Sequence, residues 1–350
     1  MVLRASNTIN VIPAKAGIHP VLKGLDSRLR GNDNRVCLAH FVRRSKYLVF
    51  KTKPQLTITS ALNQTQHFLN KSQIPDARLE AELLLSHLLK SDRTNLYRNA
   101  SEFLSSRTKN LLKTMLEKRA RHYPLAYLTG RKEFMGLCFL VNQHVLVPRP
   151  ETELLVETAL ELLQKQKKYL LLDIGTGSGN IAISLARLSP NKKLKIFASD
   201  ISAGALKVAR TNACFHKVSR LIKFCRGNLF RAFNRFNLHE KVDLIVSNPP
   251  YISNRERKNL PLDVRKYEPP AALYVPTGSR GTFFHKQIIT ESTRYLKPGG
   301  YLVMEIGIGQ APELKEFLEK IGYFDMIIFL SDYNSIPRVV VTRCSGNSEL

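Results

Sequence analysis

The chain has 350 residues, of which 43% are hydrophobic, so it can bury a full core and form about two domains. It contains no run of about eighteen apolar residues and no apolar secretory signal, which excludes a membrane-spanning or secreted protein and predicts a cytoplasmic one. The net charge of +26 favours polyanionic surroundings, but no RNA-binding module is recognisable, so the charge alone assigns no nucleic-acid function.

The cysteines and histidines give no sign of a disulfide framework or a metal site. The cysteines are odd in number and widely spaced, without a Cys-x-x-Cys pair: Cys37, Cys138, Cys214, Cys225 and Cys344. The nine histidines form no His-x-x-x-His or Cys/His cluster. We therefore expect no bound metal and a reducing compartment.

Residues 1–53 are interpreted as a basic, disordered extension. They show no sustained period and contain helix breakers at Gly17, Pro20, Gly24 and Gly31. Five Lys and six Arg against two Asp give residues 1–54 a net charge of +9, which leaves +17 for the rest. Two stretches, 11–20 and 25–33, resemble the translated form of a dispersed bacterial repeat, which suggests a misplaced start codon or a tolerated insertion. An organelle presequence is the alternative, although helix breakers do not suit its amphipathic helix.

Residues 54–123 predict a small helical bundle. Apolar residues recur at helical spacing in three stretches: Leu62, Phe68 and Leu69; Leu79, Leu83, Leu84, Leu88 and Leu89; and Leu111, Leu112, Met115 and Leu116. Asp76 is the expected N-cap of the second helix. Polar connectors around 91–92 and 105–106 separate the helices. Leucine stripes more commonly form a core than a docking surface, but a bundle beside a catalytic domain commonly helps to bind a macromolecular substrate, and we assign it that role.

Residues 124–147 predict a β-hairpin linker, because two β-rich runs flank the polar pair Asn142-Gln143. A helix is then expected to begin at Pro150, since proline is favoured in the first helical turn. Glu151 and Glu153 would lie in that turn, where acidic side chains suit the positive end of the helix dipole. A second domain is therefore expected to begin at residue 148.

An apolar strand leads into a glycine-rich loop at Tyr169-Leu-Leu-Leu-Asp-Ile-Gly-Thr-Gly-Ser-Gly179, and a helix is expected over 180–188. Gly175 and Gly177 allow a ligand to approach the backbone closely, and Asp173 can accept hydrogen bonds at the loop. The Gly-x-Gly-x-Gly spacing differs from the dinucleotide fingerprint and from the phosphate-binding loop. It is typical of S-adenosylmethionine sites, whose candidate residues here are Asp173, Gly175, Thr176, Gly177, Ser178 and Gly179.

Two further strand ends carry side chains suited to a nucleoside. The strand over 195–200 ends at Asp200, 21 residues after Gly179, and a carboxylate there can accept both ribose hydroxyls. Asp200 could also cap the next helix, and the two roles are compatible. A third strand, 222–225, precedes Asn228, whose side chain could hydrogen-bond the adenine.

A fourth apolar strand, 242–247, ends at Asn248-Pro249-Pro250-Tyr251, because two successive prolines cannot continue a strand. Ending a strand is itself a sufficient structural explanation for the prolines. However, the glycine loop, Asp200 and this tetrapeptide all follow strands of one sheet, so we expect them to converge on one crevice. The order and spacing of these motifs resemble class I S-adenosylmethionine-dependent methyltransferases, specifically those that methylate a planar amino or amide nitrogen. The resemblance implies a Rossmann-like α/β fold.

Seven motifs resemble the HemK/PrmC family: Leu125-Ala-Tyr-Leu-Thr-Gly, Glu133-Phe-x-Gly-Leu, Pro148-Arg-Pro-Glu-Thr-Glu153, Asn248-Pro-Pro-Tyr, Tyr267-Glu-Pro-x-x-Ala-Leu273, Leu296-Lys-Pro-Gly-Gly-x-Leu and Glu305-Ile-Gly-x-x-Gln310. The resemblance as a whole spans about residues 56–342. The resemblance implies methyl transfer from S-adenosylmethionine to the side-chain amide nitrogen of the glutamine in the Gly-Gly-Gln motif of class-one peptide-chain release factors. Those factors are the implied partners, and the reaction modulates translation termination. A seven-stranded sheet is implied within a methyltransferase domain over 148–345, with last strands 324–330 and 338–342.

The chain departs from this family in two places. Arg280 stands where relatives often carry an acidic residue after the Ala-Leu pair. Asn228-Leu229 stands where relatives often have Asp followed by an aromatic residue near the adenine. Asn228 can still donate and accept hydrogen bonds, but Leu229 cannot stack as an aromatic ring does. These departures concern cofactor affinity more than reaction type.

For this reaction, Asn248 would contact both cofactor and substrate. Its side-chain oxygen and the Pro249 carbonyl would accept the two N–H bonds of the substrate amide, while Pro250 and Tyr251 would complete the substrate contact and exclude water. The alternatives are a ribosomal-protein glutamine methyltransferase, which typically has Pro-Arg-Ser-Pro at 148–151, and a methyltransferase of amino groups in ribosomal RNA or DNA. A binding module that has lost activity is the alternative from a different class.

Overall fold

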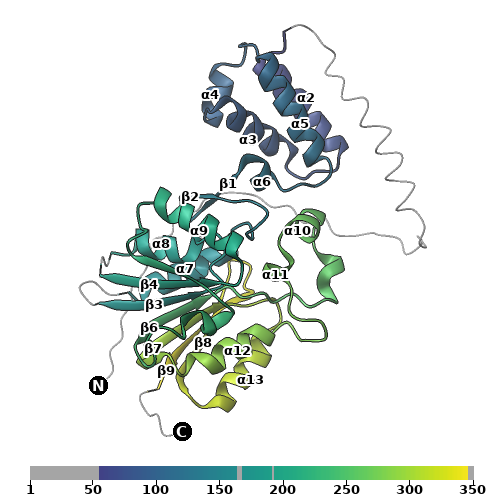
Figure 1. Ribbon diagram of the computed structural model, residues 1–350. Helices are drawn as coiled ribbons and strands as arrows, with labels where there is room; N and C mark the ends of the chain where they lie inside the picture. The colour runs from purple at the N-terminus through teal and green to yellow at the C-terminus, as the bar shows by residue number, and fades with distance from the viewer. Residues whose placement is uncertain (1–54, 164–167, 191–192, 346–350) are drawn as a thin grey trace, which may run out of the picture. The chain divides into compact units, whose positions relative to one another are not determined.

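The computed structural model of the protein describes residues 55–163, 168–190 and 193–345, so the predicted extension over 1–53 lies outside them. Within these residues, an all-helical segment is followed by a two-stranded hairpin and then by a seven-stranded sheet with helices (Figure 1). Among the described residues, no helix is both long and apolar enough to cross a membrane.

The seven-stranded sheet confirms the predicted fold class. Its strands are β3 Tyr169–Ile174, β4 Leu194–Asp200, β5 Ile222–Arg226, β6 Val242–Ser247, β7 Leu296–Glu305, β8 Phe324–Ser331 and β9 Pro337–Cys344. Their order in space is β5-β4-β3-β6-β7-β9-β8. The strands from β5 to β7 are parallel, and β9 runs antiparallel to β7 and β8. The sequence predicted β8 and β9 within two residues at each end.

The winding of the sheet reverses between β3 and β6. From β3 the chain adds β4 and β5 on one side, and it then returns to place β6 on the other side. Ile174 at the end of β3 pairs with Ser199 of β4 and with Ser247 of β6. The residues that follow these strands therefore leave the same edge of the sheet, at the reversal point where open α/β sheets bind ligands.

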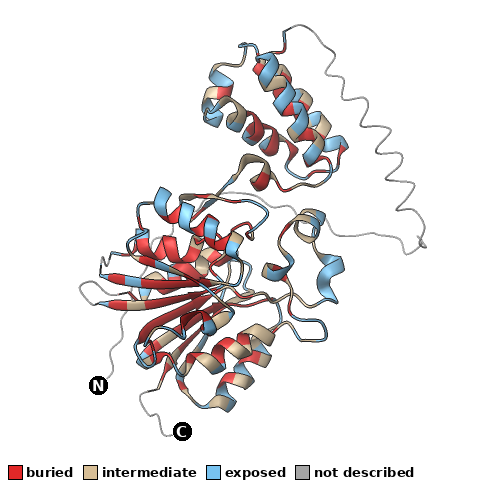
Figure 2. Cartoon of the chain, in the orientation of Figure 1, coloured by how far each residue is buried: buried red, intermediate tan, exposed pale blue. Residues whose placement is uncertain are grey.

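Helices cover both faces of the sheet, so its central strands are almost completely buried (Figure 2). One face packs against α7 (Glu151–Glu161), α8 (Asn180–Leu188) and α9 (Ala203–Phe215). The other face packs against η2 (Leu229–Phe233), α12 (Phe283–Ser292) and α13 (Ala311–Ile321). This burial on both sides explains why β3 and β6 are continuous apolar runs instead of alternating apolar and polar residues.

The helical segment consists, over the residues that the structure describes, of α2 (Ile58–Lys71), α3 (Ala77–Leu89), α4 (Arg93–Arg98), α5 (Ser106–Arg119) and α6 (Leu125–Thr129). Leu84, Leu85 and Leu112 are among the side chains that fill its core. The predicted stripes are partly wrong, because Leu79, Leu83 and Leu111 are 41%, 36% and 46% exposed. On α3 the buried face is shifted by about one residue toward the C-terminus relative to the predicted stripe, and it includes Leu84 and Leu85.

Side chains cap most of these helices. Thr57, Asp92 and Ser105 each accept a hydrogen bond from a backbone N–H in the first turn of α2, α4 and α5. Asp76 precedes α3 as predicted, but its side chain makes no capping bond. The prediction was wrong because Asp76 has a left-handed backbone with φ of +52°, whereas a capping residue needs an extended one.

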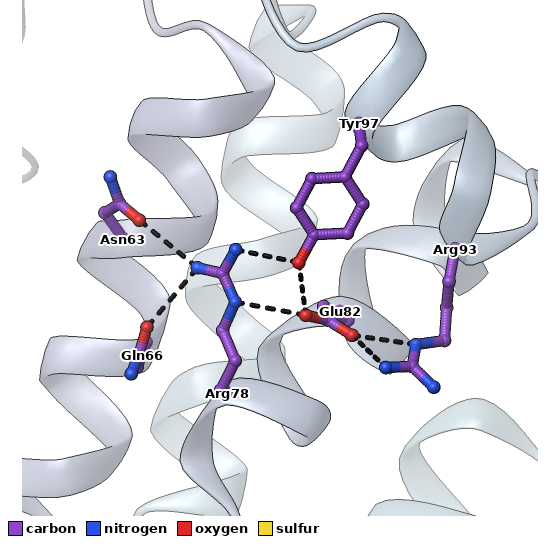
Figure 3. Close-up of polar contacts among 6 residues, drawn as sticks. All are labelled: Asn63, Gln66, Arg78, Glu82, Arg93 and Tyr97. Carbon is purple, nitrogen blue, oxygen red and sulfur yellow. Dashed lines mark hydrogen bonds and ion pairs between the residues drawn. The ribbon is translucent and has the colours of Figure 1, made fainter.

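A polar network around Glu82 joins α2, α3 and α4 (Figure 3). The Glu82 carboxylate, with 4% of its side chain exposed, accepts hydrogen bonds from Arg78, Arg93 and the Tyr97 hydroxyl. Arg78 also donates to Asn63 and Gln66 on α2. A buried carboxylate is tolerated only when donors surround it, and Arg78, Arg93 and Tyr97 are those donors. Asn63 and Gln66 accept from Arg78 and so hold its guanidinium in place.

The predicted hairpin is present as β1 (Arg131–Phe134) and β2 (Leu137–Leu140), but its turn lies at Met135-Gly136 and not at Asn142-Gln143. Both turn residues have positive φ, +53° and +68°, as a type I′ turn requires. The prediction was wrong because the apolar Met135 made the turn look like part of a strand. The Met135 N–H donates to Glu153 Oε1 at 2.6 Å, which ties the turn to α7.

Between β6 and α12 the chain forms η3 (Glu256–Asn259), α10 (Leu262–Tyr267) and α11 (Pro270–Leu273). Glu268, which follows α10, is 4% exposed and accepts a 2.7 Å hydrogen bond from Arg149 Nη2 and a 3.2 Å bond from the Val147 N–H. This ion pair joins the segment after the Asn-Pro-Pro-Tyr motif to the residues that lead into α7. Burial is the main cause that raises the pKa of Glu268.

Candidate active site

The glycine loop leaves open space above the end of β3. Gly175 and Gly179 have φ of +75° and +82°. A Cβ on Gly175 would meet no atom within 4 Å, whereas a Cβ on Gly179 would lie 2.8 Å from Ile183 Cδ1. Gly179 is therefore required by backbone conformation and by packing against α8, while the loop beside Gly175 is free for a ligand to approach.

Asp173 and Thr176 support the loop from below. Thr176 Oγ1 donates a 2.6 Å hydrogen bond to Asp173 Oδ2, and the Thr176 N–H donates to the Ser199 carbonyl. Asp173 Oδ1 is buried and has no partner among the described residues, and burial raises the pKa of Asp173 to about 7. Ser178 is also buried, and its hydroxyl bonds to the Asn180 side chain. Ser178 therefore supports the start of α8 from inside the loop.

Asp200 connects the second strand to the glycine loop. Its Oδ2 accepts a 2.9 Å hydrogen bond from the Gly177 N–H, and its Oδ1 accepts a 2.8 Å bond from the Ser202 N–H. Each oxygen keeps a further lone pair that a ribose hydroxyl could use. The N-cap of α9 is Ser202, which accepts from the Ala205 N–H, so Asp200 does not fill the capping role that the sequence left open.

Asn228 lies beside this carboxylate, because the preceding Gly227 N–H donates to the Asp200 carbonyl. Its side chain is exposed and does not cap η2. Leu229 has φ of +45°, an uncommon conformation for a leucine, and is half-buried against the core beneath η2. The backbone thus presents Asn228 at the same edge of the sheet as Asp200, and within the described residues no hydrogen bond holds its side-chain amide in place.

Asn248 follows β6 directly beside the glycine loop, since Ser247 pairs with Ile174. Its Nδ2 donates to Thr152 Oγ1 at 3.0 Å and to Glu305 Oε2 at 2.8 Å. Thr152 Oγ1 donates to the same Glu305 oxygen at 2.5 Å. The Asn248 amino group is therefore held within the protein by Thr152 and Glu305, while its Oδ1 has no hydrogen-bond partner among the described residues.

Tyr251 is positioned by its backbone and by its hydroxyl. Gln310 Nε2 donates to the Tyr251 carbonyl at 3.2 Å, and the Tyr251 hydroxyl donates to Glu305 Oε1 at 3.3 Å. A Cβ on Gly281 would lie 2.6 Å from the Tyr251 carbonyl, and one on Gly307 would lie 2.9 Å from Tyr251 Cδ2. Pro249 is buried and Pro250 half-buried between these anchors. Burial, followed by the charge of Glu305, raises the pKa of Tyr251, so the phenol stays protonated.

Comparison with known proteins identifies the family. Residues 60–130 match the family model described as the PrmC N-terminal domain, and residues 150–262 match the methyltransferase small domain. A release factor glutamine methyltransferase from Geobacter sulfurreducens is 39% identical over 292 residues, which cover 83% of this chain and 98% of the relative. This chain belongs to the release factor glutamine methyltransferase family.

Other members of the family agree with this assignment. The release factor glutamine methyltransferase of Koribacter versatilis is 35% identical, with 82% of this chain and 99% of the relative covered. A bifunctional methyltransferase of Rickettsia typhi is 36% identical over 77% of this chain, but the match covers 54% of that longer relative. The resemblance that seven short motifs indicated is thus confirmed over most of the chain.

S-adenosylmethionine is the methyl donor of this methyltransferase, and the glycine loop fits it. Open space lies beside Gly175, the buried Asp173 Oδ1 lacks a partner, and Asp200 retains acceptor capacity. The individual contacts of Asp173, Asp200 and Asn228 with the cofactor stay predictions. Arg280, which departs from the family pattern, is 82% exposed and lies 3.7 Å from Glu313, so it does not enter this network.

Sequence analysis missed two members of the site, Thr152 and Glu305. Both stood inside motifs that the family resemblance singled out, but neither was assigned a function. Glu305 is 2% exposed and ends β7, the strand that pairs with β6. An acidic residue at the carboxyl end of an apolar strand adjacent to Asn248 was the available signal, because strand ends of one parallel sheet share an edge.

Proposed function

We propose that this methyltransferase transfers the methyl group of S-adenosylmethionine to the N5 amide nitrogen of the glutamine in the Gly-Gly-Gln motif of class-one peptide-chain release factors. The reaction would modulate translation termination. The names of its family relatives support this substrate. The observation that carries the proposal is the Asn248 amide, whose amino group is bound by Thr152 and Glu305 while its oxygen is left for a donor from outside.

A glutamine amide nitrogen is a poor nucleophile, because its lone pair is delocalised into the carbonyl. The Asn248 oxygen and the Pro249 carbonyl would each accept one N–H of the substrate amide. This pair of contacts would orient the nitrogen and favour the positive charge that develops on it. Well-oriented reactants can lower a barrier by about 7–11 kcal/mol, so positioning supplies most of the catalysis here.

S-adenosylmethionine supplies an electrophilic methyl group on a sulfonium centre. In the transfer, the methyl–sulfur bond breaks as the nitrogen–methyl bond forms, and sulfur keeps the bonding electron pair. The substrate nitrogen then loses a proton to water, because only the methylated nitrogen is acidic. No general base is needed before the attack. Tyr251 would pack on the amide plane and exclude water, which suits a phenol that stays neutral.

We further propose that the helical bundle, residues 54–123, binds the protein substrate, with the hairpin linker at 124–147 and the methyltransferase domain at 148–345. The exposed apolar side chains of the bundle support this: Leu79, Leu83, Tyr97, Phe103 and Leu111. Leu79 and Leu83 lie one turn apart on α3, and neighbouring exposed apolar side chains of this kind suit a protein-binding surface. A release factor is thus the proposed partner.

The test is transfer of label from S-adenosylmethionine carrying a radioactive methyl group. The protein is incubated with a class-one release factor, with the same factor carrying Gln-to-Ala in its Gly-Gly-Gln motif, and with transfer RNA. Label is expected on the unchanged factor only. Label on RNA, or label that survives the Gln-to-Ala change, would contradict the proposed substrate and favour one of the alternative methyltransferases.

A further inference from the structure

Glu305 lies at the meeting point of three elements of the active site. Its carboxylate receives hydrogen bonds from Thr152 at the start of α7, from Asn248 after β6 and from the Tyr251 hydroxyl. Glu305 itself ends β7 and is 2% exposed. Two of its three donors belong to the Asn-Pro-Pro-Tyr motif, so any movement of this carboxylate displaces the proposed substrate contacts.

This carboxylate has no direct ionic partner in the part of the chain that the structure describes. No Lys, Arg or His side chain there lies within ion-pair distance of it, and Arg338, which influences it electrostatically, is paired with Asp332. A buried carboxylate without a cation is unfavourable for folding unless hydrogen bonds compensate. Three neutral donors provide that compensation, which suggests that the charge serves the site and not stability.

An ionised carboxylate can only accept hydrogen bonds, so it fixes the direction in which the Asn248 amide points. If the amide rotated by half a turn, Oδ1 would face Glu305 Oε2 and two acceptors would repel each other. The amino group must therefore face Glu305, and the oxygen must face the opposite way. Only this orientation allows Asn248 to accept a substrate N–H.

We propose that Glu305 is a positioning residue that locks the Asn248 amide in its accepting orientation. This inference rests on the proposed function, because it assumes that Asn248 accepts an N–H of the substrate amide. Protonation of Glu305 would release the lock. A carboxylic acid can donate to Asn248 Oδ1, so the amide could rotate and present its amino group to the substrate, where two donors would repel.

The surroundings of Glu305 place this change near neutrality. Burial and the charge of Glu151 on α7 raise the pKa of Glu305, whereas the bonds from Thr152 and Tyr251 and the charge of Arg338 on β9 lower it. The resulting pKa is about 7. His285 of α12 contacts the Glu305 carbonyl, but burial lowers the pKa of His285 to about 4, so it stays neutral in this range. The active form is ionised, and the rate should therefore fall as pH falls through about 7.

The test measures single-turnover methyl transfer to a class-one release factor across the neutral pH range, with S-adenosylmethionine saturating so that Asp173 does not contribute through cofactor binding. For the unchanged protein we expect the rate to rise with pH through a single ionisation near 7. Glu305→Gln should lower the rate roughly 100-fold, because the amide that replaces the carboxylate no longer dictates the rotation of Asn248, and the ionisation should vanish.

Thr152→Val provides a second test, in which the direction of the shift in the pH–rate profile is predicted. The Thr152 hydroxyl favours the ionised form of Glu305, so its removal should raise the pKa of Glu305. The acid limb of the pH–rate profile, where the rate falls as pH falls, should therefore move to higher pH. Asp243→Asn is the control for loss of a buried carboxylate elsewhere in the sheet. Asp243 lies at the opposite end of β6, where it bonds to the Leu170 N–H and is ion-paired with Lys297. Its loss should leave the acid limb in place.

The inference is overturned if Glu305→Gln keeps the rate or the acid limb, or if Thr152→Val leaves the limb unmoved. If Glu305→Gln does not fold, the pH–rate profile of Thr152→Val alone tests the inference. A protein that labels no release factor at any pH refutes the proposed function instead, so the two failures are distinguishable. We expect the equilibrium affinity of each variant for S-adenosylmethionine to be unchanged. An unchanged affinity shows that a loss of rate comes from the position of Asn248 and not from disruption of the glycine loop.

Discussion

Asn248 is set apart because its amino group is anchored inside the protein, by Thr152 and by Glu305. An asparagine that merely ends a strand needs no such anchoring. At the scale of the single residue, the chemistry depends on an oxygen that is oriented but not occupied. The proposed reaction therefore predicts that changes to Asn248 affect the rate far more than they affect folding or cofactor binding.

Asn248→Asp tests this most sharply. The new carboxylate would face Glu305 where Nδ2 now lies 2.8 Å away, and two adjacent carboxylates cannot both ionise, so one must take up a proton. We expect the rate of methyl transfer to a release factor to fall by roughly 100-fold or more, as it does when one transition-state contact is lost. Tyr251→Phe is the comparison, since it keeps the ring and removes one of the three donors to Glu305, so a smaller loss of rate is expected. A variant Asn248→Asp with unchanged single-turnover rate would refute the accepting role.

At the scale of the element, the glycine loop joins a strand to a helix by a turn that only glycine can make. Gly179→Ala would place a Cβ 2.8 Å from Ile183 Cδ1 in a backbone with φ of +82°. We expect a loss of about 2–4 kcal/mol in the free energy of unfolding, from the left-handed backbone and from overpacking, and weaker binding of S-adenosylmethionine.

Gly130→Ala is the matched comparison for the loop. Gly130 has a similar φ of +70° and ends α6, but a Cβ there would meet no atom within 4 Å. Gly130→Ala should therefore lower the free energy of unfolding by only about 1–2 kcal/mol, the cost of alanine in a left-handed backbone, and leave cofactor affinity unchanged. Denaturant unfolding and calorimetric titration of the cofactor measure both quantities. Equal destabilisation by the two substitutions would show that packing of the loop on α8 is unimportant.

The elements differ in how far the sequence could predict them. The strand, glycine loop and helix over 169–188 were predicted with their boundaries, because apolar runs, glycines and helical period all act locally. The hairpin turn at Met135-Gly136 was missed, since an apolar residue occupied a turn position. Glu305 was missed for another reason: its bond to Asn248 joins residues 57 positions apart and exists only because β7 pairs with β6.

At the scale of the whole molecule, the site is assembled from separated parts of the chain. The glycine loop follows β3, Asp200 ends β4, Asn248 follows β6 and Glu305 ends β7. The parallel pairing of these strands is what brings the four together at one edge. The helical bundle adds none of these four groups, which is consistent with the proposal that it binds substrate and takes no part in the chemical step.

This division predicts a kinetic separation. Leu79 and Leu83 lie one turn apart on α3 and are 41% and 36% exposed. Replacing both with serine should raise the KM for a full-length release factor about tenfold, or about 1.4 kcal/mol, and leave kcat unchanged. Methylation of a short Gly-Gly-Gln peptide, which cannot reach the bundle, should not change. Leu188→Ser removes a leucine of similar exposure, 39%, from α8 and should leave both substrates unaffected. If the double variant instead lowers kcat on the peptide, the bundle supports the active site itself and the proposed division of roles is wrong.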